Sequence, residues 1–412
     1  MNTIAAIIII TLLGDFILHI IADNRNLAML RNELPAEFEN FYDPDRYRQS
    51  QAYLKVNTRF GWLASTFSLF LILVFWFGKG FPFLDQWVRS AGFGPIWTGL
   101  IFIGILLLLK MMISLPLNIY DTFVIENRFG FNRTTKGTFA LDLIKSLALA
   151  ILLGGPLLAG ILAFFEYAGA HAWLYCWGAA TVYMLVVQYV APTWILPLFN
   201  KFDPIEEGPL KNAILSYARS IQFPLKNVYV MDGSKRSTKS NAFFTGFGRH
   251  RRIVLFDTLI KQHTIAELLG VLAHEMGHYK KKHLLVMLIL GIAEIGLMFF
   301  LLSFFISYTK LFEAFYMDQM SVYAGMIFFG MLYSPIVFFL GLFTRMISRK
   351  NEYAADRFAI KTTGDFQSLA MALKKLSVDN LANLLPHPLY VFLNYSHPPV
   401  LERLKAIKEI RL

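Results

Sequence analysis

The feature that most constrains this chain is a series of long apolar stretches, each about as long as a membrane span. A helix of about 20 apolar residues crosses roughly 30 Å of hydrocarbon, and inside a bilayer only helices and closed barrels satisfy their own backbone groups. Charged residues make up 16% of the 412 residues, against about 25% in a typical soluble domain. We therefore predict an all-α membrane protein with seven transmembrane helices, at 3–22, 60–78, 96–118, 139–165, 171–195, 284–308 and 322–343.

The charges between these stretches predict the topology. Of 39 Lys and Arg residues, 34 lie in segments 23–59, 119–138, 196–283 and 344–412, and only three lie in the alternating segments. Because Lys and Arg accumulate in cytoplasmic loops, the N-terminus is expected outside and the C-terminal tail inside. Topology also accounts for the net charge of +11, so no nucleic acid partner is expected.

The predicted spans divide the chain into four parts. Residues 1–22 lack a basic leader and a cleavage site of small residues, so we interpret them as a retained span and not as a signal peptide. The parts are the first five helices with their loops (1–195), a cytoplasmic loop (196–283), the last two membrane helices (284–343) and a helical cytoplasmic tail (344–412).

The loop 196–283 carries its own secondary-structure signals. Residues 211–220 favour a short helix, while 227–230, 241–248 and 252–256 favour the strands of a small sheet or β-hairpin. Thr264 and Glu267 form a capping-box pattern, which predicts the start of another helix.

That last helix contains the motif His274-Glu275-Met276-Gly277-His278. Two histidines four residues apart lie on one helical face and can bind one ion. Glu275 lies about 100° around the helix, where it can accept a proton from the attacking water. This is the H-E-x-x-H arrangement of zinc metalloproteases, although two exposed histidines on a juxtamembrane helix remain the alternative.

A zinc site with two histidines needs a third protein ligand and an open position. The single cysteine, Cys176, lies in an apolar stretch and supports neither a disulfide nor a cysteine-based zinc site. Glu352 and Asp356 stand at i and i+4, so Glu352 can ligate while Asp356 hydrogen-bonds the outer nitrogen of a ligand histidine. The alternative is a helix surface on which these carboxylates balance neighbouring basic residues.

Several separated motifs resemble one family over nearly the whole chain. Besides H-E-x-x-H and the later E-x-x-x-D, they are Ser-Asn-Ala-Phe-Phe at 240–244, Pro-Leu-Phe-Asn-Lys-Phe at 197–202, Arg-Ile-Val-Leu-Phe-Asp-Thr-Leu at 252–259 and Asn-Tyr-Ser-His-Pro-Pro at 394–399. In this order they are similar to the integral-membrane zinc proteases called CAAX prenyl protease 1. Short loops, and Lys239 where the family often has a histidine, favour a bacterial homologue in the plasma membrane.

The resemblance implies an architecture and a set of roles. It implies seven long helices around a chamber, with one Zn²⁺ at the cytoplasmic end, and cleavage of prenylated C-terminal CAAX peptides. His274, His278 and Glu352 would bind the zinc, and Glu275 would be the base. His397 would stabilise the scissile carbonyl, Arg403 would contact substrate, and Asn241, Ala242 and Phe243 would form the edge strand to which the peptide adds.

Other functions remain open on the sequence. The same site would also suit membrane protein quality control without a prenyl requirement, and the chamber would suit a non-proteolytic chaperone or scaffold. Ionisable residues inside the spans also fit a transporter, but a transporter gives no reason for a paired-histidine helix with a later glutamate. His and carboxylate sites accept several first-row metals, so zinc itself is an expectation.

Overall fold

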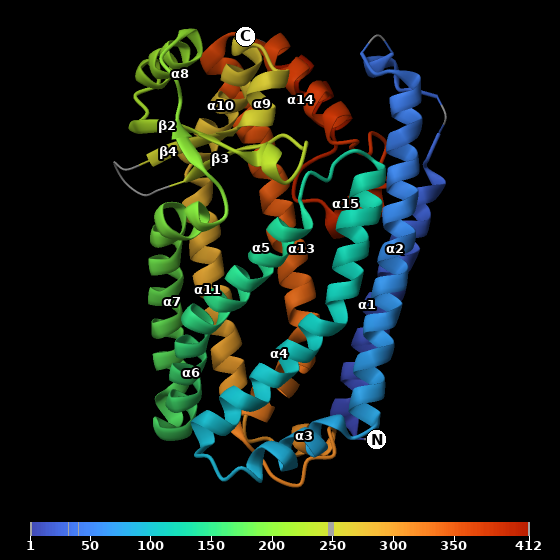
Figure 1. Cartoon of the computed structure of the whole chain (residues 1–412), viewed down its shortest axis with the longest axis vertical. Helices are drawn as coiled ribbons and strands as arrows, with labels where there is room; N and C mark the ends of the chain where they lie inside the picture. The colour runs from blue at the N-terminus through green and yellow to red at the C-terminus, as the bar shows by residue number, and fades with distance from the viewer. Residues whose placement is uncertain (1, 32, 40, 246–250, 411–412) are drawn as a thin grey trace.

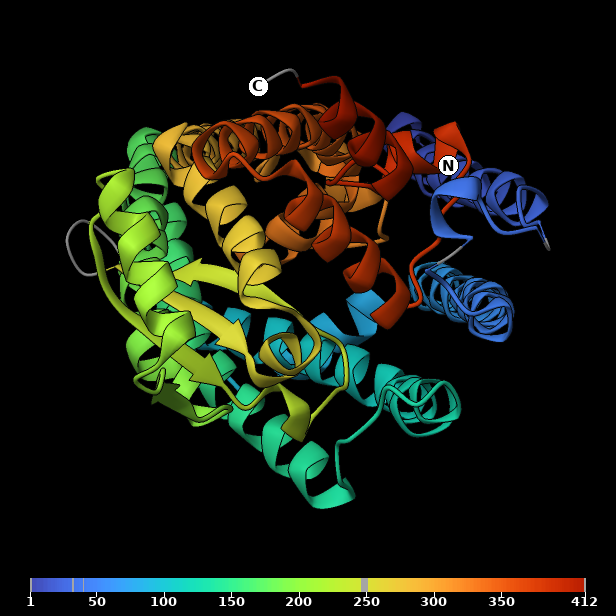
Figure 2. The same ribbon diagram turned by 90° about the horizontal axis from the view of Figure 1, so that it is seen from above.

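The computed structural model describes residues 2–31, 33–39, 41–245 and 251–410, without the side chains of residues 226, 244, 245 and 251. Within these residues, seven helices are long and apolar enough to cross a membrane. They stand in a ring when seen from above (Figures 1 and 2). The predicted fold of seven membrane helices with a small sheet is therefore confirmed. The membrane helices are α1 (Thr3–Ala28), α2 (Pro44–Phe77), α4 (Pro95–Tyr120), α5 (Lys136–Leu149) with α6 (Gly155–Tyr167), α7 (Ala172–Val190), α11 (His283–Phe305) and α13 (Val322–Thr363).

Three of these helices contain π-helical turns, in which the backbone bonds run to the fifth residue. The turns extend α4 to Glu126, join α5 to α6 and extend α7 toward Leu198, so each pair of segments forms one long rod. The turns lie at Asp121–Glu126, Ala150–Gly154 and Ala191–Ile195.

The helices differ from the predicted spans mainly at their ends. α2 begins at Pro44, well before the predicted 60, and α13 continues to Thr363, well past the predicted 343. In both helices, the additional residues lie outside the apolar stretch and form a more polar continuation of the same helix. Apolar composition therefore marks the membrane-crossing part of each helix and not the ends of the helix.

The end of the ring near the N-terminus is packed with aromatic side chains. Here α3 (Gly80–Arg89) and α12 (Thr309–Glu313) lie across the membrane helices (Figure 1). Trp76 donates a hydrogen bond to the carbonyl of Ala314 at 2.8 Å, and the rings of Phe315 and Phe328 stack with centroids 3.9 Å apart. These buried rings hold the helix ends together at the end of the molecule opposite the sheet.

The other end carries a four-stranded sheet in the order β1-β2-β4-β3. β2 runs parallel to β4, whereas β1 and β3 pair antiparallel with their neighbours, so β3 is an edge strand. The three predicted strands are present, and β1 is an addition that the sequence pattern did not reveal. The predicted glycine turn at 246–248 lies outside the described residues. The strands are β1 (Phe202–Pro204), β2 (Leu225–Met231), β3 (Ala242–Thr245) and β4 (Arg251–Phe256).

Short helices surround this sheet and share its core. Leu255, Leu268, Leu272 and Leu369 are buried between the sheet and the helices, each 1% exposed or less. The predicted helix at 211–220 is α8, and the tail is helical as expected. The helices are α8 (Pro209–Ser220), α9 (Asp257–Gln262), α10 (Ile265–Lys280), α14 (Phe366–Asp379), α15 (Pro388–Asn394) and α16 (Val400–Glu409).

A partly buried ion pair fixes the loop that leads into β3. Lys239 donates hydrogen bonds to Glu126 at 2.8 Å and to the Tyr53 hydroxyl at 3.0 Å, and its ammonium lies 4.4 Å from the centre of the Phe131 ring. Burial alone would lower the pKa of Lys239, but Glu126 and Tyr53 outweigh burial and raise it. The loop is thus held against α2 and the end of α4, which sets the position of the edge strand.

Candidate metal centre

The helix α10 presents the two histidines of the motif. Its start has the predicted capping box, in which Thr264 accepts from the Glu267 amide and Glu267 accepts from the Thr264 amide. His274 and His278 lie one turn apart, and their Nε2 atoms are 3.1 Å from each other. The two imidazoles therefore point at a common position beside the helix.

Glu352 reaches the same position from α13. Its carboxylate oxygens lie 3.4 Å from His274 Nε2 and 3.2 Å from His278 Nε2. The close approach of the two helices depends on Gly277, because a Cβ there would lie 3.2 Å from the backbone of Ala355. One ligand atom from each of His274, His278 and Glu352 lies within 4.8 Å of the others.

This donor set fits a zinc ion. Glu352 is 3% exposed, yet its Oε2 atom has no hydrogen-bond partner among the described residues, and a buried carboxylate oxygen without one is costly. A cation between the carboxylate and the two imidazoles would satisfy it. Two histidines and one glutamate, with a fourth position open, are a typical ligand set of catalytic zinc sites.

A second layer of charges surrounds these side chains. Asp356 Oδ1 lies 2.8 Å from His274 Nδ1, on the side of the ring away from Glu352. Arg403 donates two hydrogen bonds to Asp356, at 2.6 and 2.9 Å, and its Nη1 lies 3.4 Å from Glu352. Arg403 is 8% exposed and its guanidinium contacts both carboxylates, while the implied contact with substrate stays a prediction.

These charges shift the pKa values of the groups on α10. Burial disfavours the charged form of His274, but the hydrogen bond with Asp356 and the neighbouring Glu352 carboxylate outweigh burial and raise its pKa to about 9. Burial also raises the pKa of Glu275, although the neighbouring His274 and His278 act in the opposite direction. A carboxyl group with a raised pKa is a better proton acceptor near neutral pH.

His397 lies at the open side of the centre. Its side chain is 64% exposed, its Nε2 lies 3.4 Å from Glu352 Oε1, and its Nδ1 lies 3.0 Å from the Ser396 hydroxyl. It stands in the turn between α15 and α16, whose two prolines, Pro398 and Pro399, restrict the backbone. His397 is thus the exposed histidine of the group, while His274 is buried.

The predicted edge strand lies beside α10. Ala242 and Phe243 belong to β3, whose outer side is unpaired among the described residues, whereas Asn241 precedes the strand. The amide of Ser240 donates to Asn380 Oδ1 at 3.2 Å, and its hydroxyl hydrogen-bonds Gln262 at 2.5 Å. The start of the strand is therefore fixed to α14 and α9.

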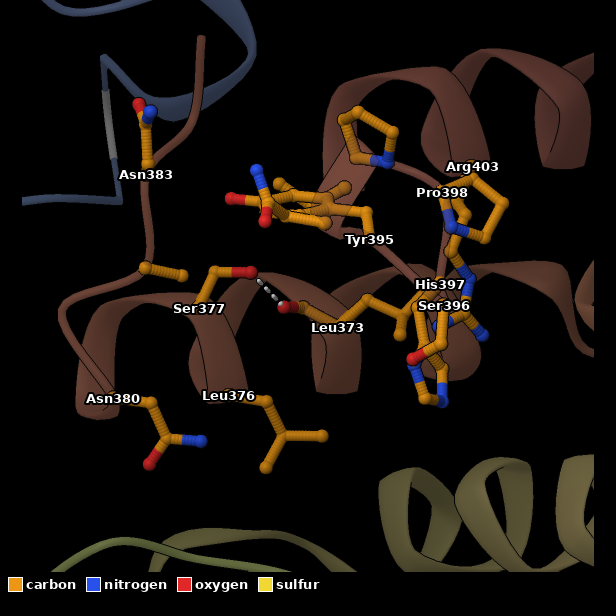
Figure 3. A pocket seen from close by; sticks show the side chains of 14 residues that line it. Leu373, Leu376, Ser377, Asn380, Asn383, Tyr395, Ser396, His397, Pro398 and Arg403 are labelled. Atoms are coloured by element: carbon orange, nitrogen blue, oxygen red, sulfur yellow. Dashed lines mark hydrogen bonds between the residues drawn. The ribbon is translucent and has the colours of Figure 1, made fainter. Parts of the chain in front are cut away.

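A cavity of about 510 Å³ lies beside His397 and Arg403 (Figure 3). Its walls come from α14, the following turn, the segment between α15 and α16, and the first turn of α16. Leu373, Leu376 and the two prolines make it largely apolar, while Asn380 and Asn383 add neutral amides on the side away from His397. Apart from Arg403, which is engaged by Asp356, and His397, its described walls carry no side chain that is charged near neutral pH.

The structure adds one histidine that the sequence analysis did not single out. His283, the first residue of α11, is 9% exposed, and its Nδ1 lies 3.1 Å from His278 Nδ1. Lys282 has a φ of 59°, and this left-handed residue turns the chain so that His283 folds back onto α10. In the sequence, only the spacing of five residues between His278 and His283 could have indicated that the two side chains lie close together.

Comparisons with known proteins agree with this arrangement. Residues 23–201 match the family described as "CAAX prenyl protease N-terminal, five membrane helices", and residues 204–411 match "Peptidase family M48". The chain is 36% identical to the "Probable CAAX prenyl protease 1" of Schizosaccharomyces pombe, with 92% of this chain and 83% of that protein covered. It is 34% identical to the "CAAX prenyl protease 1 homolog" of Mus musculus, with 94% and 91% covered.

A solved structure has the same fold. The crystal structure of S. mikatae Ste24p superposes with a TM-score of 0.92 at 32% sequence identity, and 99% of each chain is covered. The superposition therefore includes the membrane ring, the sheet and the tail helices.

Proposed function

The chain belongs to the CAAX prenyl protease 1 family of M48 metallopeptidases, and from this premise we propose that it hydrolyses a peptide bond near the C-terminus of prenylated CAAX-type substrates. The observation that carries the proposal is the convergence of His274, His278 and Glu352 on one point, with Glu275 beside it. We propose one Zn²⁺ per chain as the ion at that point.

The residues of the site have separate roles in hydrolysis. Bound zinc would acidify a water molecule and polarise the scissile carbonyl. Glu275 takes the proton from the attacking water at its carboxylate and then delivers it to the leaving amine nitrogen, for which its raised pKa is suited. His397, exposed at the open side, donates a hydrogen bond from Nε2 to the carbonyl oxygen as negative charge develops there.

The second layer holds the ligands in place. Asp356 accepts a hydrogen bond from Nδ1 of His274, which leaves Nε2 free to face the ion. Arg403 fixes Asp356 by two hydrogen bonds and offsets the negative charge of Glu352. We propose that Arg403 acts on substrate indirectly, through the position of these carboxylates.

The peptide lies along the edge strand. Its main chain adds to β3 at Ala242 and Phe243, and Asn241 contacts it at the start of the strand. The apolar cavity beside His397 receives a substrate side chain, and the scarcity of charge on its walls favours aliphatic residues.

The proposal includes a location. The chain is a multi-pass membrane protein, and we propose a bacterial plasma membrane with the N-terminus outside and the metal centre in the cytoplasm. The excess of Lys and Arg in segments 196–283 and 344–412, which carry the site, supports this orientation. The short loops support the bacterial origin.

The test is cleavage of three substrates by the purified protein in liposomes: a farnesylated CAAX peptide, its unprenylated twin and casein. We expect cleavage of the farnesylated peptide, with loss of activity in Glu275→Gln and after removal of the metal by a chelator. Equal cleavage of all three would instead indicate general membrane proteolysis, and no cleavage of any would favour a chaperone role.

A further inference from the structure

A second cavity, of about 450 Å³, lies between α1 and α13 below the metal centre. Arg345 of α13 lines it, together with Asp15 and His19 of α1 and Leu393 of α15. Leu393 stands four residues before His397, so the cavity adjoins the segment that leads into the metal centre. It is a separate cavity from the one beside His397.

Arg345 and Glu352 share one face of α13. They stand seven residues apart, which is two turns, and at 100° per residue their directions differ by about 20°. Phe343, in contrast, points about 160° away from Arg345 and does not line the cavity. Arg345 therefore faces inward, on the side of the helix that carries the metal ligand.

The guanidinium of Arg345 has no side-chain partner among the residues that the structure describes, in contrast to two neighbouring arginines. Arg403 is engaged by Asp356 and Glu352, and Arg349 donates to the backbone carbonyls of Val391 and Tyr395. Arg345 forms no ion pair or hydrogen bond with any side chain that the structure describes.

The cavity around Arg345 leaves room for an anion. The side chain folds back along the helix into the space beside Gly341, where a Cβ would lie 3.2 Å from its Nη1, and the cavity lies beyond it. Asp15, the carboxylate that lines the cavity, lies 3.6 Å from His19 on its own helix and within 4.0 Å of no described lysine or arginine. The positive charge of Arg345 thus remains available to a ligand.

We propose that Arg345 binds the C-terminal carboxylate of the peptide substrate and thereby sets the number of residues released. The proposal rests on the proposed function, and it takes the bond cut to be the one after the prenylated cysteine of a CAAX peptide, so that three residues follow it. Three extended residues span about 10 Å, and seven residues of helix span about 10.5 Å. Both side chains lean toward the N-terminal end of α13, so this separation also holds between the carboxylate of Glu352 and the guanidinium.

The first test measures binding without cleavage. The Glu275→Gln protein in detergent is titrated with a fluorescent CAAX peptide that ends in a carboxylate, and with the same peptide ending in a carboxamide. We expect at least tenfold tighter binding of the carboxylate, and we expect Arg345→Gln in the same background to remove this preference. Equal binding of the two peptides before the Arg345 change would overturn the proposal, even if the protein proves to be a CAAX protease.

The second test measures the position of the cut. Peptides with two, three, four or five residues after the scissile bond are offered to the Glu275-containing protein. We expect a preference for three that disappears in Arg345→Gln and is partly kept in Arg345→Lys. Lys350→Gln removes the same charge from an exposed position of α13 and should keep the preference. A preference for three residues that survives in Arg345→Gln would overturn the proposal.

The two tests separate this inference from the proposed function. A carboxylate preference in binding that depends on Arg345 supports the carboxylate site, even where no peptide is cut. Unchanged binding of the carboxamide peptide to the Arg345→Gln protein shows that the variant is folded.

Discussion

At the scale of single residues, the candidate centre depends on hydrogen bonds that fix the ring orientation of its histidines. His274 has Asp356 at its outer nitrogen, and His278 has His283. When His278 Nε2 faces a metal, its Nδ1 carries the proton and donates to His283 Nδ1. The two motif histidines are therefore held by different partners, a carboxylate and a neutral imidazole.

Replacing His283 with alanine should weaken metal binding about 10- to 100-fold, because the ring of His278 loses its orienting acceptor. His283→Asn, which retains an acceptor, should lose less. Zinc affinity measured by competition with a chelator checks this. His171→Ala, which removes an exposed histidine from the opposite end of the molecule, should bind zinc as the unchanged protein does. Unaltered affinity in His283→Ala would show that His283 does not position the ligand.

The site residues that could be predicted from the sequence are those whose helical spacing places them on one face of a helix. His274, His278 and the pair Glu352 and Asp356 follow helical spacing, and the structure brings them together. His283 was missed because its contact depends on the left-handed backbone at Lys282, which apolar patterns do not reveal. Arg345 was missed because the predicted span ended at 343, so the residue was not counted among the charges within the helices.

At the scale of elements, α10 is anchored at its first turn by a charge network. Glu267 is 5% exposed and accepts hydrogen bonds from the Thr264 amide at 2.8 Å and from Lys375 of α14 at 2.7 Å. Burial alone would raise the pKa of Glu267, but the bonds from Lys375 and Thr264 outweigh burial and hold it below the ordinary value. The capping residue thus also joins the motif helix to the tail.

Glu267→Gln should lower the free energy of unfolding by about 2 kcal/mol at pH 7, since it removes a buried charged hydrogen bond. The folded-state pKa lies below that of the unfolded chain, so this stabilisation is present above the unfolded value and is lost as the pH falls through the folded value. Thermal unfolding checks this. At pH 7 the unfolding temperature of Glu267→Gln should lie below that of the unchanged protein, and the difference should shrink as the pH decreases below 4.5.

A matched control for this prediction is Glu207→Gln. Glu207 pairs with Lys211 four residues later, but its side chain is 82% exposed, and such surface pairs contribute little. Its unfolding temperature should stay near that of the unchanged protein. A loss as large as that in Glu267→Gln would show that any carboxylate near a helix start has this effect.

The sheet shows where element prediction from sequence reaches its limit. β2 and β4 were predictable because apolar and β-branched residues concentrate there. β1 was not, because it has three residues, Phe202–Pro204, and its proline is tolerated only at an edge. The ends of α2 and α13 were also missed, because both helices continue past their apolar stretches and the prediction relied on apolar residues alone.

At the scale of the whole molecule, the charge distribution and the fold point to the same orientation. The motif helix α10, the sheet and α14 gather at one end of the ring, and α3 lies at the other (Figure 1). Most Lys and Arg residues lie in the segments at the first end. The positive-inside rule therefore predicts that this end faces the cytoplasm.

Reporter fusions test this orientation. A reporter that is active only in the cytoplasm should be active when inserted at Gly208 and inactive when inserted at Glu313. A reporter that is active only outside should give the opposite pattern. Activity of the outside reporter at Gly208 would refute the topology and, with it, the cytoplasmic location of the site.

The path of the chain through the metal centre also bears on when the enzyme becomes active during synthesis. His274 and His278 leave the ribosome before α11, whereas Glu352 follows only after α11 has crossed the bilayer and α13 has crossed back. The third ligand can join the first two only once this helical hairpin has inserted. A nascent chain in which this hairpin has not yet inserted therefore lacks a complete centre.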